Sequence, residues 1–379
     1  MRVAVIGGGP AGLYFAYLLK RSFPNASIDI FEQNPAHVTW GFGVVFSDQA
    51  LEFLTEDDPE TLDYITPWME AWKDLTLDLM GERVLIDGIG FAAIGRLKLL
   101  QLLHDRASSV GLSPRFHKRV DDLSVFDSHD LVVGADGQNS VVRLNIPDGF
   151  GTTIRHLRNK FIWYGTSKIF ETLTQSFRIS EWGPFNAHHY RYSENMSTFI
   201  IETDAETWEK TGFENMPAEE TRKECERIFS DVLGGLPLVS NHSKWRNFPR
   251  LWNKKWWHSN AVLLGDALHT AHFSIGSGTR LAMEDAIALV KSMNLQPDDI
   301  PAALQSYQDS RKPVVEKLMS AADASSQWYE NFGEHIKLPP WEFAYSYIRR
   351  AGRLEDKQLH ALSPGFMARY KTFRSNEAG

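Results

Sequence analysis

The sequence predicts an α/β protein in which a parallel sheet with helices forms one domain and an inserted antiparallel sheet forms a second. Three observations lead to this prediction. The chain begins with a short β-branched strand that runs into a glycine-rich turn and an apolar helix. Two later apolar strands end in acidic dipeptides with glycine, at residues 136–137 and 265–266. Between them, residues 156–250 alternate polar and apolar side chains, as antiparallel strands with one buried face do.

The segment at residues 2–20, RVAVIGGGPAGLYFAYLLK, is the most specific pattern in the sequence. It predicts a buried strand, a glycine-rich turn and a helix in immediate succession. Gly7 permits the tight turn, Gly9 lets a pyrophosphate approach the backbone, and Gly12 lets the helix pack on the sheet. The pattern therefore predicts a dinucleotide-binding site, with a glycine-rich turn that binds nothing as the simpler alternative.

The rest of this unit supports the same interpretation. The helix starts near Pro10 and Ala11, where unpaired backbone N–H groups can face an anion. A second strand at residues 27–31 ends in Glu32, whose carboxylate can accept hydrogen bonds from ribose hydroxyls. Strand, glycines, helix, strand and acid in this order are a strong signal, but they do not decide between FAD and NAD.

Two further strand ends and one helix start carry polar residues. The segment DLVVGADGQNSVVR ends an apolar strand at Asp136 and Gly137. The segment LLGDALHTAHFSIGSGTRLAMEDA ends another strand at Gly265 and Asp266 and then opens a glycine-rich helix. Arg96 stands at the head of the helix in IGRLKLLQLLHDRA. Taken singly, an acid such as Asp136 is more often a helix cap, and a cation such as Arg96 is more often a surface residue.

Taken together, these motifs resemble the class A flavoprotein aromatic hydroxylases, the single-component monooxygenases related to para-hydroxybenzoate hydroxylase. The resemblance covers residues 1 to about 325. It implies an α/β fold: an FAD-binding Rossmann-like domain of the GR2 type, with an inserted antiparallel-sheet substrate domain and C-terminal helices. It also implies bound FAD, NADH or NADPH as a transient electron donor, and O2 as a co-substrate. The reaction it implies is hydroxylation of an electron-rich ring through a flavin C4a-hydroperoxide, with no metal.

The resemblance assigns cofactor contacts to residues in each motif. Arg96 matches the arginine that contacts the flavin, Val120 meets the adenine through its backbone, and Asp266 holds ribityl or ribose hydroxyls. The N–H groups from Gly276 to Thr279 face the pyrimidine edge of the flavin. The full set of implied contacts is Gly7, Gly9, Pro10, Ala11, Gly12, Glu32, Gly43, Val44, Arg96, Val120, Asp136, Gly137, Gly265, Asp266, Gly276, Gly278 and Thr279.

Four segments narrow the resemblance to the branch that hydroxylates aryl-CoA thioesters. The substrate that this implies is salicylyl-CoA, hydroxylated at its 5-position to gentisyl-CoA. The alternatives are 2-aminobenzoyl-CoA and tryptophan or another indole. An alternative of a different class is a flavin-binding reductase or subunit that does not oxygenate. The segments are WGFGVVFSD (40–48), FIWYGTSKIF (161–170), AHHYRYSENMSTFIIETDAETWEKTG (187–212) and HFSIGSGTRLAMEDA (272–286).

Three residues are candidates for the substrate side of the site. The expected strand at residues 186–192 places His188 on one face with two tyrosines. His188 is a candidate for proton handling or ring contact, with a hydrogen-bonded structural histidine as the equal alternative. His272 and Phe273 lie nearer the ring position that the resemblance implies. The family usually has proline where this chain has Phe273, so the shape of the pocket there is expected to differ.

Composition limits the possible partners. A net charge of −8 and a pI of about 5.9 argue against a broad nucleic-acid-binding surface. The single cysteine, Cys225, excludes an internal disulfide and fits a reducing cytoplasm. No uninterrupted apolar stretch is long enough to cross a membrane. We therefore expect a cytoplasmic monomer or homodimer that binds a small aromatic molecule, a CoA thioester by the resemblance.

The spacing of the motifs predicts how the chain is divided. The helical pattern from residue 300 onward contains Pro313, which is expected to mark a kink or a boundary. The predicted parts are a discontinuous FAD-binding domain over residues 1–75, 94–155 and 256–325, a substrate-binding sheet domain over 76–93 and 156–255, and a C-terminal helical segment over 326–379.

Overall fold

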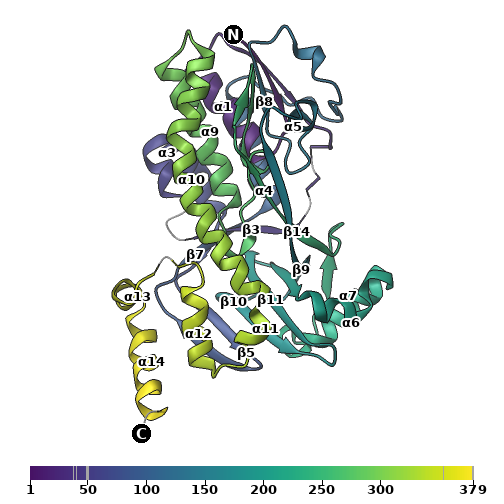
Figure 1. Ribbon diagram of the computed structural model, residues 1–379, viewed down its shortest axis with the longest axis vertical. Coiled ribbons are helices and arrows are strands. Elements are labelled where there is room, and N and C mark those ends of the chain that lie inside the picture. The colour runs from purple at the N-terminus through teal and green to yellow at the C-terminus, as the bar shows by residue number, and fades with distance from the viewer. Residues whose placement is uncertain (37, 40, 48–50, 353, 378–379) are drawn as a thin grey trace.

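The computed structural model describes residues 1–36, 38–39, 41–47, 51–352 and 354–377, so Trp40 and Asp48 of the WGFGVVFSD segment lie outside the described residues. A parallel-sheet lobe contains the N-terminus, and an antiparallel-sheet lobe lies at the other end of the molecule (Figure 1). The long helix α10 (Ile300–Glu330) runs alongside both lobes. No helix within the described residues has the length and apolar composition to cross a bilayer.

The parallel-sheet lobe is built on a five-stranded sheet with the order β15-β16-β8-β1-β2. All neighbours are parallel except the short β15, which pairs antiparallel with β16. Helices α1 and α9 pack on each other and α4 packs on α1, so the strands are covered by apolar helix faces. The bounds are β1 (Arg2–Ile6), β2 (Ser27–Phe31), β8 (Leu131–Gly134), β15 (Trp257–His258), β16 (Ala261–Leu263), α1 (Pro10–Ser22), α4 (Arg96–Ser109), α5 (Val141–Asn145) and α9 (Gly278–Leu295).

The second lobe is built on an eight-stranded sheet with the order β13-β9-β12-β11-β10-β5-β6, and β14 also pairs with β9. Neighbouring strands within this sheet run antiparallel, except for β5 and β10, which run parallel to each other. One face packs on helices α6 to α8. The bounds are β5 (Leu75–Leu79), β6 (Glu82–Ile86), β9 (Thr152–Thr166), β10 (Leu173–Ile179), β11 (Pro184–Ser193), β12 (Met196–Thr203), β13 (Leu238–Ser240), β14 (Arg246–Asn253), α6 (Ala205–Thr211), α7 (Ala218–Ile228) and α8 (Ser230–Leu233).

A three-stranded sheet with the order β3-β7-β4 lies between the lobes. Strand β7 leads directly into α4, so Arg96 sits where this small sheet meets the parallel-sheet lobe. The bounds are β3 (Gly43–Ser47), β4 (Glu70–Trp72), β7 (Phe91–Gly95), α2 (Glu52–Asp57) and α3 (Pro59–Ile65), with short 3-10 turns η1 (Thr66–Trp68), η2 (Ser124–Phe126) and η3 (Phe213–Asn215).

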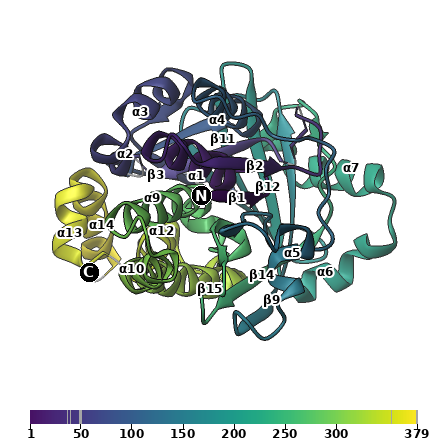
Figure 2. The same ribbon diagram turned by 90° about the horizontal axis from the view of Figure 1, so that it is seen from above.

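The C-terminal helices cover the other face of the eight-stranded sheet. Helix α10 continues through Pro313, so no boundary falls there, although proline cannot donate its backbone hydrogen bond. Phe177 of β10 packs against Trp328 and Phe343, at ring-centroid distances of 6.2 and 4.8 Å. Helices α6 and α7 lie on the opposite side of the molecule from α13 and α14 (Figure 2). The bounds are α11 (Phe332–His335), α12 (Pro340–Arg349), α13 (Asp356–Leu362) and α14 (Pro364–Glu377).

Candidate functional site

The three acid-and-glycine motifs meet at the carboxyl ends of β1, β8 and β16. Gly7 has φ +110°, and a Cβ added to it would lie 2.3 Å from the carbonyl oxygen of Ala135. Gly265 has φ +56°, and its Cβ would lie 3.2 Å from the Cβ of Ala11 and 3.1 Å from that of Ala282. Glycine at these two positions lets the turns approach one another. The chain therefore brings the first helix start, the Asp-Gly turn and the Gly-Asp turn together.

The glycines of the first turn differ in what surrounds them. A Cβ on Gly12 would lie 2.0 Å from the carbonyl oxygen of Gly7, so the helix packs against the turn only because this side chain is absent. A Cβ on Gly9 would meet nothing within 4 Å. Gly9 thus borders open space at the N-terminus of α1, where backbone N–H groups favour an anion. These surroundings fit the pyrophosphate of FAD.

Glu32 is held in place by backbone contacts on both sides. Its Oε2 accepts a hydrogen bond from the N–H of Gly8 at 2.8 Å, and its Oε1 accepts one from the N–H of Asn34 at 2.7 Å. Its backbone N–H donates to the carbonyl of Arg115 at 3.0 Å. The segment that leads to Val120 therefore runs beside the tip of β2, where the adenine contact was expected.

Asp136 combines a structural contact with an open one. Its Oδ2 accepts a hydrogen bond from the N–H of Val141 at 2.6 Å, which caps helix α5. Its Oδ1 is buried and has no partner among the described residues. Burial raises the pKa of this carboxyl group. Gly137 follows with φ +78°, and no atom within 4 Å would meet an added Cβ. One oxygen is thus free to accept a hydrogen bond from a cofactor hydroxyl.

Asp266 lies among positive charges. Burial raises the pKa of its carboxyl group, and Arg96, His269 and Arg246 oppose that rise. Its side chain nevertheless remains accessible to water. Arg96 is fixed by a hydrogen bond from its Nε to Thr39 Oγ1 at 3.0 Å. Two arginines and an accessible carboxylate suit a ligand that carries both phosphates and hydroxyls. No sequence pattern pointed to Arg246, which β14 contributes from the antiparallel-sheet lobe.

A buried network anchors the Gly-Asp turn. His269 Nε2 lies 3.0 Å from Asp285 Oδ2, and Asp285 also accepts hydrogen bonds from the N–H of Gly265 at 3.2 Å and from Arg311 Nε at 2.9 Å. Burial alone would raise the pKa of Asp285, but His269 and Arg311 hold it below its ordinary value. His269 therefore supports the turn. The acid within the apolar helix pattern MEDAIALV was the available signal for Asp285.

The start of β3 is fastened to the antiparallel-sheet lobe. Gly43 donates its N–H to Thr198 Oγ1 at 2.9 Å and accepts a hydrogen bond from the Tyr190 hydroxyl at 3.1 Å. A Cβ on Gly43 would lie 2.5 Å from that of Tyr192, so this glycine permits close packing. The side chain of Val44 is buried, so a contact between Val44 and the cofactor would have to come from its backbone.

The start of α9 faces β3. Gly276 has φ +59°, and an added Cβ would lie 3.3 Å from Val45 Cγ1. Helix α9 begins at Gly278, with Thr279 next, and a Cβ on Gly278 would meet nothing within 4 Å. The structure therefore brings the expected flavin contacts on β3 and on α9 to one place.

The substrate-side candidates form a second, adjoining cluster. Both ring nitrogens of His188 are buried without a hydrogen-bond partner among the described residues. Burial, together with the charge of Arg350, lowers the pKa of His188 to about 3. Burial, Arg350 and His188 lower the pKa of His272 to about 3, and its Nδ1 lies 2.8 Å from Ser274 Oγ. Both imidazoles are therefore neutral near pH 7. Phe273 lies beside His272, with ring centroids 4.2 Å apart.

Arg350, at the end of α12, was not expected from the sequence. Its Nη2 donates to the carbonyl of Ser274 at 2.9 Å, and its guanidinium carbon lies 3.8 Å from the centroid of the Tyr347 ring. Its Nε is buried without a partner, and no described carboxylate forms an ion pair with it. In the sequence YIRR it resembles an ordinary solvated helix end. A half-buried cation whose Nε is free of protein partners, beside His188 and His272, provides a binding place for an anionic or strongly polar ligand group.

A buried acid lies on the same face of the sheet. Glu202 is 3% exposed, and its Oε1 accepts a hydrogen bond from Asn159 Nδ2 at 2.8 Å. Burial raises the pKa of Glu202 from 4.5 to about 8. The unfolded chain loses this proton near pH 4.5 and the folded chain near pH 8. A rise in pH between these values therefore favours the unfolded state.

We expect Glu202→Gln to raise the melting temperature at pH 8 and to leave it nearly unchanged at pH 5. The amide keeps a similar shape and carries no ionisation cost. Thermal unfolding of both proteins across this pH range measures the effect. If the melting temperatures of wild type and variant changed with pH in the same way, this explanation of the Glu202 ionisation would be contradicted.

Comparison with known proteins agrees with this geometry. Residues 90–322 match a family model described as an FAD binding domain, and residues 5–69 match an NAD(P)-binding Rossmann-like domain. A probable FAD-dependent monooxygenase from Pseudomonas aeruginosa has the same fold, with a TM-score of 0.69 at 20% identity over 92% of this chain and 99% of that chain.

Three relatives are similar over most of their length. Salicyloyl-CoA 5-hydroxylase of Streptomyces sp is 41% identical over 93% of this chain and 70% of the relative. A 3-hydroxy-4-methyl-anthranilyl-[aryl-carrier protein] 5-monooxygenase of Streptosporangium sibiricum is 36% identical over 87% of this chain and 89% of the relative. Protodeoxyviolaceinate monooxygenase of Chromobacterium violaceum is 35% identical over 92% of this chain and 94% of the relative. The predicted resemblance is confirmed, and the chain belongs to the FAD-dependent aromatic monooxygenases.

Proposed function

We propose that the substrate is an aromatic acyl thioester, with salicylyl-CoA as the first candidate and gentisyl-CoA as its product. The observation that carries this proposal is the 41% identity with a relative named as salicyloyl-CoA 5-hydroxylase. The 5-position of that ring is para to its hydroxyl group, so it is an electron-rich carbon. The relative named for an anthranilyl thioester acts at the carbon para to the amino group, which is activated in the same way.

Arg350 and the two histidines are proposed to bind the activating group of the ring. FAD, when bound, supplies the oxygen-transfer chemistry, with electrons from NADH or NADPH and with O2. A cation close to a phenol lowers the pKa of that phenol, so Arg350 favours the phenolate. The phenolate donates more electron density to the para carbon than the phenol does. Neutral His188 and His272 can each accept or donate a hydrogen bond as that proton leaves.

The aromatic residues around the cluster are proposed to exclude water and orient the ring. Phe273 packs against Phe161 at a ring-centroid distance of 5.0 Å, and Phe248 lies 4.9 Å from His272. These side chains come from η5 (Phe273–Ile275), β9 and β14. An apolar wall beside a polar cluster strengthens the electrostatic contacts within it.

Turnover of a panel of substrates tests this proposal. Purified FAD-loaded protein is given NADH or NADPH with salicylyl-CoA, 2-aminobenzoyl-CoA, free salicylate or tryptophan, and the products are identified by mass spectrometry. We expect one added oxygen on a thioester and none on free salicylate. Oxygen added only to tryptophan would contradict the thioester proposal, and peroxide as the sole product with every compound would favour a reductase.

A second candidate is the same aryl group carried on a protein. The observation that favours it is the 36% identity with a relative that acts on an aryl-carrier-protein thioester, aligned over 89% of that relative. Competition between salicylyl-CoA and a salicylyl carrier protein, each at the same concentration, separates the two. Faster turnover of the carrier-bound ring would favour this candidate.

A further inference from the structure

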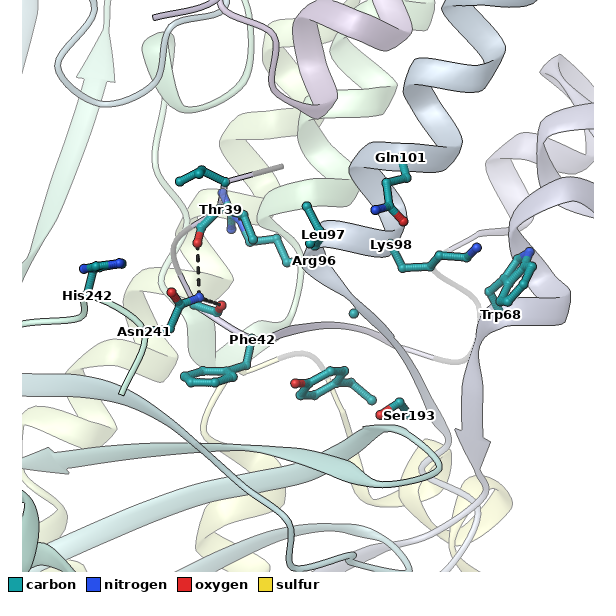
Figure 3. A pocket seen from close by; sticks show the side chains of 14 residues that line it. Thr39, Phe42, Trp68, Arg96, Leu97, Lys98, Gln101, Ser193, Asn241 and His242 are labelled. Atoms are coloured by element: carbon teal, nitrogen blue, oxygen red, sulfur yellow. Dashed lines mark hydrogen bonds between the residues drawn. The ribbon is translucent and has the colours of Figure 1, made fainter. Parts of the chain in front are cut away.

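A separate pocket opens beside the proposed site. It has a volume of about 590 Å³ and lies between the first turn of α4, the loop before β3 and the end of β11 (Figure 3). Of the residues proposed to contact FAD, Arg96 alone lines it. Its volume falls in the usual range for small-molecule sites, about 300 to 1,000 Å³. This pocket is therefore a neighbour of the cofactor cradle and a candidate for a different ligand.

The charges around the pocket favour an anion. Arg96, Lys98 and His242 line it, and none of its described lining residues is acidic, although the whole chain has a net charge of −8. The Lys98 ammonium forms no ion pair with a described carboxylate. A pocket lined by one sign of charge concentrates ligands of the opposite sign. A phosphorylated ligand matches this lining.

An exposed indole adds a surface for a flat ring. Trp68 is 53% exposed, and the Lys98 ammonium lies 3.2 Å from the centroid of its ring. In Figure 3 the Lys98 side chain extends to Trp68 at one end of the pocket, while Asn241 and His242 lie toward the other end. Aromatic side chains stack on bases, and a nearby cation binds the attached phosphates. The combination suits a nucleotide.

Strand β11 connects this pocket with the substrate cluster. Tyr192 lines the pocket, and His188 and Tyr190 lie earlier on the same strand, whose pairing with β12 shifts register between Arg191 and Ser193. Four residues of strand span about 13 Å, at about 3.3 Å per residue. A single ligand that reaches both places must have a long arm between an aromatic ring and a nucleotide. A CoA thioester has this form, since its pantetheine arm joins the acyl group to phosphorylated adenosine.

We propose that this pocket binds the phosphorylated adenosine end of an aryl-CoA substrate. The inference rests on the proposed function and adds where the CoA part lies and which residues recognise it. Lys98 and Arg96 face its phosphates, and Trp68 stacks on the adenine. To reach His188, the arm of the thioester has to pass the packed contact of Tyr190 and Tyr192 with Gly43, so binding of the whole substrate requires β3 to shift there.

Kinetics with a full and a truncated thioester test the inference. Salicylyl-CoA and salicylyl-pantetheine, which lacks the nucleotide, are compared with FAD-loaded wild type, Lys98→Ala and Trp68→Ala. Wild type is expected to have the lower KM for the CoA ester. Loss of one charged contact is expected to raise that KM by about tenfold in Lys98→Ala, which brings the two KM values together. Lys223→Ala on α7, an exposed lysine away from the pocket lining, is the matched control.

The possible outcomes separate this inference from the proposed function. Equal KM values for the two esters in wild type, or a Lys98→Ala effect on the KM of NADH or NADPH instead, would overturn the CoA assignment while leaving thioester hydroxylation intact. Wild type that hydroxylates neither ester would remove both proposals. Flavin absorbance and melting temperature show that each variant is folded, and Trp68→Ala gives an independent measurement if Lys98→Ala is unstable.

Discussion

Arg350→Met is expected to lower kcat/KM for hydroxylation by about 100-fold while NADH or NADPH oxidation continues, with hydrogen peroxide as the main product. The expected loss corresponds to about 2.7 kcal/mol, the scale of one buried charge-assisted contact. Arg350 has a buried, unpartnered Nε next to neutral His188 and His272, so its removal takes away the charge proposed to stabilise the phenolate. The ratio of product formed to cofactor oxidised measures this uncoupling.

The neighbouring arginine provides a matched control for this variant. Arg349 is on the same helix, is exposed and pairs with Asp356 at 3.3 Å, so Arg349→Met is expected to keep coupled turnover. Arg350→Lys should recover part of the activity, because it restores the charge without the planar guanidinium. A pH profile adds a readout beyond folding: the variant should require a higher pH, at which the substrate phenol ionises without help. Unchanged coupling in folded Arg350→Met would refute the proposed role.

Two alanine substitutions in the first turn are expected to fail for different reasons. Gly12→Ala places a Cβ 2.0 Å from the Gly7 carbonyl oxygen, a backbone atom that cannot move aside, so the protein should be unstable and colourless. Gly9→Ala places its Cβ in open space, so the protein should fold and yet bind FAD at least about tenfold more weakly. Flavin absorbance after purification and the melting temperature of the apoprotein separate the two effects.

A third glycine completes this comparison. Gly111→Ala changes a position far from the motifs, where an added Cβ meets nothing within 4 Å but φ is +79°. The melting temperature of Gly111→Ala therefore measures the cost of backbone strain alone, and this variant should still bind FAD. A Gly9→Ala protein with wild-type FAD affinity would show that the cofactor does not approach the backbone there.

The turns expected to hold the cofactor could be predicted from sequence, because local backbone geometry determines them. Gly7 and Gly265 both adopt positive φ, and each lies where a side chain would block a neighbouring turn. Such requirements leave glycine at fixed spacings in the sequence. The role of Asp136 was ambiguous in the sequence, between a helix cap and a cofactor contact. In the structure one carboxylate oxygen accepts a hydrogen bond from the first N–H of α5, and the other has no partner among the described residues. The two alternatives considered for it describe different atoms of one side chain.

The substrate side could be predicted only in part, because it depends on long-range packing. His188 was named because the segment at residues 187–212 resembles the family branch, yet its neighbour Arg350 comes from a helix more than a hundred residues later. Nothing local to YIRR distinguishes an arginine that turns its Nε inward from a solvated one. Pro313 was expected to mark a kink or a boundary; the boundary is wrong, because α10 continues through it. Tertiary contacts outweigh a local preference in such cases.

The order of strands in the parallel sheet has a consequence for how the chain folds during synthesis. β8 ends at Gly134, but its sheet neighbour β16 begins only at Ala261, after the whole antiparallel lobe has been made. The strands β10, β11 and β12 pair in chain order and β9 pairs with β12, so this part of the antiparallel sheet can form first. Until β16 and α9 leave the ribosome, the edge of β8 and one apolar side of α1 have no partner. The turns expected to bind the flavin therefore come together only after β16 and the start of α9 have been made, while the C-terminal helices are still to follow.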